Sequence, residues 1–352
     1  MPLPDFYLKP LGLFTGLAVD VLNAKGEAGR LGGGATGFTH VELVSRKSGA
    51  SAIKTYGHIA GSRDGLLTDA LAQIEARRAS VAGFDFSTPV IMGIVNVTPD
   101  SFSDGGQFSD TATAIRHGRK LVEDGAQILD IGGESTRPGS EPVSEAEELN
   151  RILPVLRGLG NESAVLSCDT RKSAVMRAAA GAGAAMINDV TALSYQPDAR
   201  DTAASLGLPV VLMHSKGEPK TMQEKPEYED VCLDVYDALS EKIAACEAAG
   251  IPRKLIIADP GIGFGKTFEH NLQLLHGLAM FHGLGVPLML GVSRKAFIGA
   301  LTGENQADNR VVGSVAAALA GLQRGVQVFR VHDVRETAQA FAVWSGVERE
   351  AV

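Results

Sequence analysis

Polar side chains recur at one kind of place in this chain, where a short apolar run ends. Eight such runs begin at Val90, Gln127, Ala164, Ala184, Pro209, Lys254, Pro287 and Val326. The polar residues that end or follow them are, in order, Asn96, Asp130, Glu134, Asp169, Asn188, Asp189, His214, Asp259, Ser293, Arg294, Lys295, Arg330 and His332. Amides, carboxylates and cations of these kinds can bind a polar ligand, hold a metal ion or transfer protons.

Cationic side chains gather after the last two runs. Lys295 follows the seventh run, and Arg330 and His332 are two residues apart in the eighth, so on a strand they face the same side. A guanidinium, an imidazole and an ammonium that converge suit a phosphate or a pyrophosphate. The alternative is a structural ion pair of Arg330 with Asp333 or another acidic neighbour.

Carboxylates and an amide end three other runs. Asp169, Asn188 and Asp259 are expected to converge, and buried carboxylates are costly unless they accept hydrogen bonds or pair with cations. This set suits a flat heterocycle with several N–H donors, such as a pterin, and it would also suit a divalent metal or an acid–base pair. Cys168 precedes Asp169 and is expected to face the surrounding helices instead.

The segment DPGIGFGKT from Asp259 looks like a nucleotide P-loop but does not have its spacing. Three residues separate Gly261 from Gly265, and the P-loop needs four. An ATPase is therefore not expected. The glycines are expected to let the backbone approach a ligand closely, with Phe264 as a stacking or wall residue. His214 could face the ligand or hold the loop that follows it.

The elements that must position these residues form a (β/α)8 TIM barrel, because eight strand-like runs alternate with helical segments and end in polar groups. A barrel takes about 250 residues, and the chain has 352. We therefore predict an α/β fold with a barrel in residues 87–352 and a small α/β extension in residues 1–86. In the extension, THVELVSR from Thr39 predicts a strand and LLTDALAQIEARRAS from Leu66 predicts a helix. The extension could be a regulatory or substrate-handling domain, or a segment packed against the barrel or a partner subunit.

Composition excludes some classes of function. A net charge of −8 argues against a general binder of nucleic acid or anionic membranes, which would need a basic face. The three cysteines, Cys168, Cys232 and Cys246, are scattered and show no metal-ligand spacing, which favours a reduced cytoplasmic setting. Charged residues interrupt the apolar runs near the N-terminus, so neither a signal peptide nor a membrane span is expected.

Seven motifs together resemble those of dihydropteroate synthase. They are NVTPDSFSDGG from Asn96, GGESTRPG from Gly132, INDV from Ile187, LMH from Leu212, DPGIGFGK from Asp259, SRK from Ser293 and RVHDV from Arg330. They follow that family's order, lie at strand ends, and leave residues 1–86 outside the match. A pterin-binding methyltransferase is a second candidate, although it would need no pyrophosphate clamp. A non-catalytic pterin-binding protein is a third.

The resemblance implies a transferase of folate biosynthesis. Such an enzyme joins 6-hydroxymethyl-7,8-dihydropterin pyrophosphate to para-aminobenzoate and releases pyrophosphate and 7,8-dihydropteroate. The resemblance also implies Mg²⁺ held by Asn96 and pyrophosphate oxygens, a homodimer through barrel helices, and inhibition by sulfonamides. We expect an SN1-like displacement in which Asp169 and Asp259 stabilise the positive charge on the pterin methylene.

The resemblance also assigns roles to single residues. The pterin would contact Asp169, Asn188, Met213, Asp259 and Lys295. The pyrophosphate would contact Asn96, Arg330 and His332. The aminobenzoate site would be shaped by Phe102, Thr136, Arg137, Pro138, Phe264 and Ser293. The residues expected to act in catalysis are Asp104, Arg137, Asp169, Asp259, Lys295, Arg330 and His332, with Asp104 and Arg137 on loops that order when substrate binds.

Overall fold

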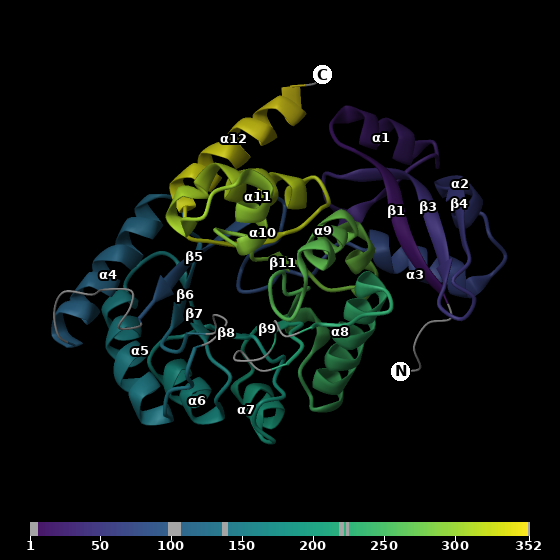
Figure 1. The fold of residues 1–352 in the computed structure, drawn as a ribbon. Helices are drawn as coiled ribbons and strands as arrows, with labels where there is room; N and C mark the ends of the chain where they lie inside the picture. Colours follow the sequence, from purple (N-terminus) through teal and green to yellow (C-terminus); the bar gives the residue numbers. More distant parts are fainter. Residues whose placement is uncertain (1–5, 98–106, 136–139, 218–221, 223–224, 351–352) are drawn as a thin grey trace.

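The molecule consists of a barrel of parallel strands enclosed by helices and a smaller sheet packed at its side (Figure 1). It is described from a computed structural model, which covers the chain except residues 1–5, 98–106, 136–139, 218–221, 223–224 and 351–352. Within the described residues, no helix is both long and apolar enough to span a bilayer.

Each of the eight predicted runs contains a strand. The strands are β5 (Val90–Asn96), β6 (Ile128–Gly132), β7 (Val165–Asp169), β8 (Met186–Asp189), β9 (Val210–Met213), β10 (Ile256–Asp259), β11 (Met289–Leu290) and β12 (Val328–Val331). They are parallel, in the order β10-β9-β8-β7-β6-β5-β12-β11. A bridge between Ala258 and Leu288 joins the two ends of this order, so the sheet closes and the predicted (β/α)8 barrel is confirmed.

Helices separate the strands and cover the outside of the barrel (Figure 1). They are α4 (Gln107–Glu123), α5 (Glu145–Leu159), α6 (Ser173–Gly181), α7 (Ala199–Leu206), α8 (Val231–Ala248), α9 (Phe268–His276), α10 (Ala296–Thr302), α11 (Val311–Leu322) and α12 (Val334–Glu350), with short 3-10 helices η3 (Arg253–Leu255), η4 (Leu278–Leu284) and η5 (Ala307–Asn309). Their starts follow local capping chemistry. The Ser144 hydroxyl, for example, accepts a hydrogen bond of 3.2 Å from the Glu147 N–H and satisfies one free donor at the start of α5.

Side chains of a strand point alternately into and out of the barrel. The inward-facing ones near the N-terminal ends of the strands are apolar and fill that half of the barrel. The residues of this inner cluster are Val81, Val90, Met92, Ile128, Met186, Val211, Ile257, Met289 and Val328. Val81 precedes the barrel and exchanges backbone hydrogen bonds of 3.0 and 2.9 Å with Phe84. Together with Phe86, this small turn packs against the cluster and closes the N-terminal end of the barrel.

Residues 6–75 form the extension. Its elements are β1 (Phe6–Phe14), α1 (Leu17–Ala24), β2 (Gly29–Arg30), η1 (Leu31–Gly33), β3 (Gly37–Ser45), β4 (Ser51–Thr55), α2 (Tyr56–Ala60) and α3 (Gly65–Glu75). β3 pairs antiparallel with β1, β2 and β4. The strand and helix predicted here correspond to β3 and α3, whereas β1, β4 and the other helices were not predicted.

The extension packs on the side of the barrel near α8 (Figure 1). The Tyr7 hydroxyl donates to Asp237 of α8 over 2.7 Å, and Arg46 forms an ion pair with Asp234 over 2.5 Å. Arg78 donates to the carbonyl of His282 in η4 over 2.7 Å. Of the two roles considered for the extension, these contacts favour a segment packed against the barrel.

Candidate active site

The polar residues at the strand ends face the barrel interior because each follows an inward-facing apolar residue of the same strand by two positions. In β10, Ile257 belongs to the inner cluster, and Asp259, two residues later, points the same way. The same step leads from Met186 to Asn188 in β8 and from Val328 to Arg330 in β12. Polar groups therefore replace apolar ones at the C-terminal ends of the strands, where barrels carry their active sites.

Asp130 lies at the centre of this polar layer. Its carboxylate is fully buried and accepts hydrogen bonds from the Ser167 hydroxyl over 2.7 Å and the Asn188 amide over 2.9 Å. It also accepts one from Arg330 Nε over 2.6 Å. Asp130 therefore fixes the orientation of both Asn188 and Arg330.

Arg330 connects two carboxylates. Besides Asp130, it contacts Asp169, whose Oδ2 accepts from Arg330 Nη2 over 2.7 Å. The partner named in the alternative sequence interpretation was wrong, because Asp333 instead pairs with Arg294 over 2.6 Å. That interpretation also allowed another acidic neighbour, and Asp130 and Asp169 fill that role.

The two acidic residues predicted to act in catalysis are both buried. Burial raises the pKa of Asp169 to about 8, although the positive charge of Arg330 opposes the shift. Burial also raises the pKa of Asp259, against the charge of Lys295 and a hydrogen bond of 2.7 Å from the Gly261 N–H. A Cβ placed on Gly291 would lie 3.9 Å from Arg330 Cβ and 4.0 Å from Asp259 Oδ2, so Arg330 and Asp259 border the same space.

Lys295 reaches this space from the start of α10. Its ammonium donates to the carbonyl of Ile262 and lies 4.5 Å from the centre of the Phe264 ring. Burial lowers the pKa of Lys295 to about 8, and the nearby Asp259 partly offsets the shift. The lysine therefore changes charge close to neutral pH, which suits a group that contacts a polar ligand.

The other described candidates lie on neighbouring strand ends. His332 is held by Ser293, whose Oγ accepts from the His332 backbone N–H over 3.1 Å and lies 3.0 Å from its Nδ1. Met213 is buried at the end of β9, opposite Asp259 in the register of β10. Asn96 ends β5 opposite Gly132 of β6. The structure thus brings together every described residue of the predicted set.

Two of the glycines after β10 have a packing role that was not predicted. A Cβ on Gly261 would overlap the carbonyl oxygen of His214, and one on Gly265 would overlap that of Lys216. These two glycines therefore admit the backbone of the adjacent loop. Gly261 and Gly265 have φ of +68° and +62°, which also favours glycine.

Lys266 and His214 form a buried contact beneath this loop. Lys266 Nζ lies 3.0 Å from His214 Nδ1 and donates to the carbonyl of Phe264 over 3.0 Å. Burial lowers the pKa of Lys266 to about 7, and burial together with the positive charge of Lys266 lowers the pKa of His214 to about 3. Of the two roles considered for His214, this contact favours holding the loop.

Two strand-end residues face away from the site. Cys168 is fully buried among the side chains that pack the helices on the barrel, as predicted. Asp189 is buried and accepts hydrogen bonds from the Thr191 N–H over 2.7 Å and the Leu193 N–H over 3.0 Å. It therefore stabilises the turn after β8.

Five predicted site residues lie outside the described part of the chain. They are Phe102, Asp104, Thr136, Arg137 and Pro138. Their assigned roles stay predictions from the family resemblance.

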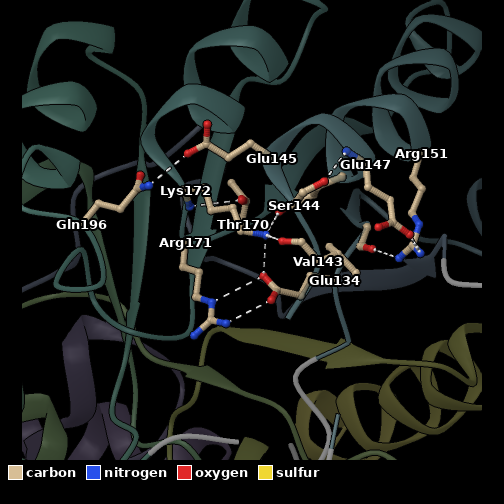
Figure 2. Close-up of polar contacts among 12 residues, drawn as sticks. Glu134, Val143, Ser144, Glu145, Glu147, Arg151, Thr170, Arg171, Lys172 and Gln196 are labelled. Carbon is tan, nitrogen blue, oxygen red and sulfur yellow. Dashed lines mark hydrogen bonds and ion pairs between the residues drawn. The ribbon is translucent and has the colours of Figure 1, made fainter. Parts of the chain in front are cut away.

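A buried ionic cluster joins Glu134 and Val143 to Arg171 and Lys172 (Figure 2). Glu134 receives hydrogen bonds over 3.0 Å from both Arg171 and Lys172. Lys172 also donates to the Val143 carbonyl over 2.7 Å and to Glu148 over 2.5 Å. Burial disfavours the charged form of Glu134, but the bonds from Arg171 and Lys172 outweigh it and lower its pKa. Glu134 and Val143 are thus both bound to Lys172 in the loop after β7.

Asp130 is the residue whose place in the site the sequence interpretation missed. It ends its apolar run together with Glu134 but was given no role. The signal that identifies it is register: it follows the inward-facing Ile128 by two residues and pairs with Ser167, which has the same phase as Asp169.

The described residues offer limited protein ligands for a metal. No group of three or more His, Cys, Asp or Glu side chains among them could hold an ion. Asn96 is a single amide at the rim of the polar layer. This donor set fits Mg²⁺ only if most of its ligands come from a bound substrate and water.

Comparisons with known proteins agree with this geometry. Residues 92–332 match the model of a family described as pterin binding enzyme. The chain is 47% identical over 261 residues to dihydropteroate synthase of Haemophilus influenzae, covering 74% of this chain and 94% of that protein. It is also similar to the solved structure of Xanthomonas albilineans dihydropteroate synthase with 4-aminobenzoic acid, at a TM-score of 0.73 and 50% identity over 77% of this chain and 98% of that one. A complex of the Xanthomonas enzyme with 7,8-dihydropteroate gives a TM-score of 0.70, 47% identity and the same coverage.

These matches span the barrel and all the strand-end residues described above. The family model matches more than half of the chain. The relatives are close to 50% identical to it, and the match covers almost their whole length. The chain belongs to the dihydropteroate synthase family of pterin-binding transferases.

Proposed function

We propose that this chain joins 6-hydroxymethyl-7,8-dihydropterin pyrophosphate to 4-aminobenzoate and releases pyrophosphate. The observation that carries the proposal is the polar layer at one barrel mouth, where Asp169, Asn188, Asp259, Lys295 and Arg330 face the same interior. The names of the Xanthomonas complexes support it, because that relative binds 4-aminobenzoic acid and 7,8-dihydropteroate.

The pterin ring is the ligand that the acidic side of the layer fits. Asn188 donates its NH2 group to Asp130, so its carbonyl oxygen remains as an acceptor for a ring N–H. Asp259, at the end of β10, offers a second acceptor, and Lys295 offers a donor. A heterocycle with alternating donors and acceptors on its edge can satisfy these groups together.

The cationic side of the layer fits the leaving pyrophosphate. Arg330 and His332 face the same side of β12, and each can donate to phosphate oxygens. Arg330 also contacts Asp130 and Asp169, which hold its guanidinium at the mouth of the barrel. When bound through Asn96, Mg²⁺ would neutralise part of the pyrophosphate charge.

The chemical step is a displacement at the pterin methylene. The carbon–oxygen bond to pyrophosphate breaks, the methylene becomes positively charged, and the amine nitrogen of 4-aminobenzoate forms the new bond and loses a proton. In their ionised forms, Asp169, which pairs with Arg330, and Asp259 are preorganised groups that can stabilise this cation without forming a covalent bond. We therefore propose an SN1-like course.

Release of pyrophosphate by the full chain tests the proposal. With both substrates and Mg²⁺, pyrophosphate and 7,8-dihydropteroate should appear in equal amounts, and removal of Mg²⁺ with a chelator should suppress both. Pterin pyrophosphate that binds without any release would indicate a non-catalytic protein. Methyl transfer from methyltetrahydrofolate without pyrophosphate release would indicate the methyltransferase alternative.

We also propose that the chain forms a homodimer through barrel helices. Val312 of α11 and Val343 and Val347 of α12 are apolar side chains that are 83%, 68% and 64% exposed. Sedimentation velocity should show a dimer that weakens in Val343→Asp. A monomer at micromolar concentration would contradict this arrangement.

A further inference from the structure

A cavity of about 520 Å³ lies between the extension and the N-terminal end of the barrel. Four stretches of the chain form its walls: parts of residues 15–36, parts of residues 77–89, the segment before β12 at residues 322–327, and the end of α12 at residues 344–348. No strand-end residue of the candidate active site lines it. Most of its lining lies outside residues 92–332, so the pterin-binding family does not account for it.

Arg78 is a buried cation in this wall that has no carboxylate partner among the described residues. It is 5% exposed, and its guanidinium donates only to the carbonyls of Gln73, Ile74 and His282, over 3.2, 3.3 and 2.7 Å. Its Nε is buried without a hydrogen-bond partner. Since a buried charge is costly unless an opposite charge compensates it, this wall favours a negatively charged ligand.

The other arginines of the cavity are already balanced. Arg30 pairs with Asp20, and Arg77 lies 3.8 Å from Asp85. The third carboxylate of the lining, Glu348, lies at the end of α12 and accepts a hydrogen bond from the Thr15 hydroxyl. Arg78 is therefore the uncompensated cation among the described residues of the lining.

Trp344 gives the cavity an aromatic wall. It lies on α12 and lines the cavity together with Phe86 and Leu17. Its indole Nε1 is buried, so the part of Trp344 that a ligand can contact is the ring and not the N–H. A flat ring can pack against these side chains.

The glycine-rich loop leaves one side of the cavity open. A Cβ on Gly33 would lie 2.7 Å from Arg77 Cα, so the backbone of Arg77 leaves no room for a side chain at position 33. At Gly34 the situation differs, because its φ is −89° and a Cβ there would meet only the Leu31 carbonyl oxygen, at 3.2 Å. A side chain at position 34 would therefore extend into the space of the cavity.

We propose that this cavity is a second ligand site, which binds a small organic anion: a carboxylate or phosphate carried by a flat ring. The anion faces Arg78, and the ring packs against Trp344 and Phe86. The site is independent of the reaction proposed at the other end of the barrel.

Fluorescence of Trp344 reports on this site directly, because it is the only tryptophan in the chain. The full chain is titrated with phenyl phosphate, with benzoate and with uncharged benzyl alcohol. We expect a saturable change in Trp344 emission with at least one of the two anions and none with benzyl alcohol. The anion that binds more tightly identifies the preferred acidic group. The same response is expected in Asp259→Ala, which excludes binding at the barrel mouth as its source.

Two variants and two controls locate the response. Arg78→Gln removes the buried charge and should weaken anion binding about tenfold or more, as expected for the loss of a charge-assisted hydrogen bond. Gly34→Leu should fill the cavity and abolish the response. Arg63→Gln makes the same change of charge at an exposed position, and Gly65→Leu adds the same side chain where nothing lies within 4 Å. Both controls should bind like the parent chain.

The proposal is overturned if neither anion gives a saturable change, or if benzyl alcohol gives the same change. It is also overturned if Gly34→Leu binds the anion like Gly65→Leu. Because Arg78 also ties α3 to η4, Arg78→Gln could fail to fold. In that event the comparison of Gly34→Leu with Gly65→Leu decides the question.

Discussion

The two ends of the barrel differ in chemistry although the same strands build them. At the N-terminal end, Ile257, Val211 and Met186 form an apolar cluster that Phe84 and Phe86 cover. Two residues further along most of the strands, the inward positions carry polar or charged groups, such as Asn188, Asp259 and Arg330. In β9 the corresponding residue is Met213. Strand alternation sets the direction of both layers, and only the type of side chain changes.

This difference separates stability from function along each strand. Burying one large aliphatic side chain contributes about 1.5–3 kcal/mol, whereas a buried ion pair often contributes nothing net and becomes strongly destabilising when one partner is lost. The lower layer therefore stabilises the fold, and the upper layer holds charges that folding alone does not require. Variants at the two ends should separate the two effects.

The largest effect is expected for Asp259→Asn at the upper end. The substitution keeps the size of the side chain and removes a preorganised negative charge, which should lower turnover by about 10²–10³-fold. Stability should hold or rise, because burial already raises the pKa of this carboxyl group. Steady-state kinetics and urea unfolding measure the two quantities. Turnover within a few-fold of the parent chain would refute the assigned role.

Arg330→Met should show the cost of an unpaired charge. It leaves Asp130 and Asp169 buried without their cation, so the free energy of unfolding at pH 7 should fall by about 3–5 kcal/mol. Burial already raises the pKa of Asp169, and loss of the Arg330 charge removes the effect that opposes this rise. The destabilisation from Asp169 is therefore present above its unfolded pKa and shrinks as the group becomes protonated at lower pH. Denaturation at pH 5 and pH 7 tests this, and a loss that does not depend on pH would contradict the explanation.

Ile257→Ala makes the matching change at the lower end of β10. Removing this buried side chain should cost about 2–5 kcal/mol of stability through lost contacts and a cavity. Turnover per folded molecule should change only a few-fold. If instead turnover collapses while stability is kept, the two layers are not functionally distinct.

The pH dependence of activity should reveal Lys295. Because its pKa is lowered to about 8, the ammonium loses its proton as pH rises through that value, and kcat/KM should then fall. Lys295→Arg keeps the positive charge over this range, so the fall near pH 8 should be absent from its remaining activity. A fall with the same midpoint in both proteins would assign it to another group.

The smallest effect is expected at the start of α5, where the Ser144 hydroxyl caps the helix. Ser144→Ala removes the hydroxyl that caps α5 beside the ionic cluster of Lys172 and should cost about 1 kcal/mol of stability. Ser144→Asp can still cap the helix and should recover most of it. A shift in the urea midpoint measures both, and equal midpoints in the two variants would argue against the cap.

The barrel could be predicted from sequence because its signal is local and repeated. Each apolar run that ends in a polar residue marks a strand and its C-terminal end. The extension was harder because β1 contains Lys9 and Pro10 and does not alternate cleanly. Its pairing with β3 forms the strand, and an edge position tolerates the proline.

The residue types of the site could also be predicted, but their pairing could not. Asp333 is adjacent to the RVH motif and was the obvious partner for Arg330. The structure pairs Arg330 with Asp130, which lies 200 positions earlier in the chain. Only the closure of the barrel brings these two strands to the same mouth, and no local pattern contains that information. The packing role of Gly261 and Gly265 could not be predicted for the same reason, since the backbone they accommodate belongs to another loop.

The account is tested most directly by pyrophosphate release in the two β10 variants, expressed per mole of folded protein at saturating substrates. Asp259→Asn should release pyrophosphate about 10²–10³-fold more slowly than the parent chain, and Ile257→Ala should stay within a few-fold of it. Similar rates in the two variants would contradict the division of the barrel into a stabilising end and a reactive end.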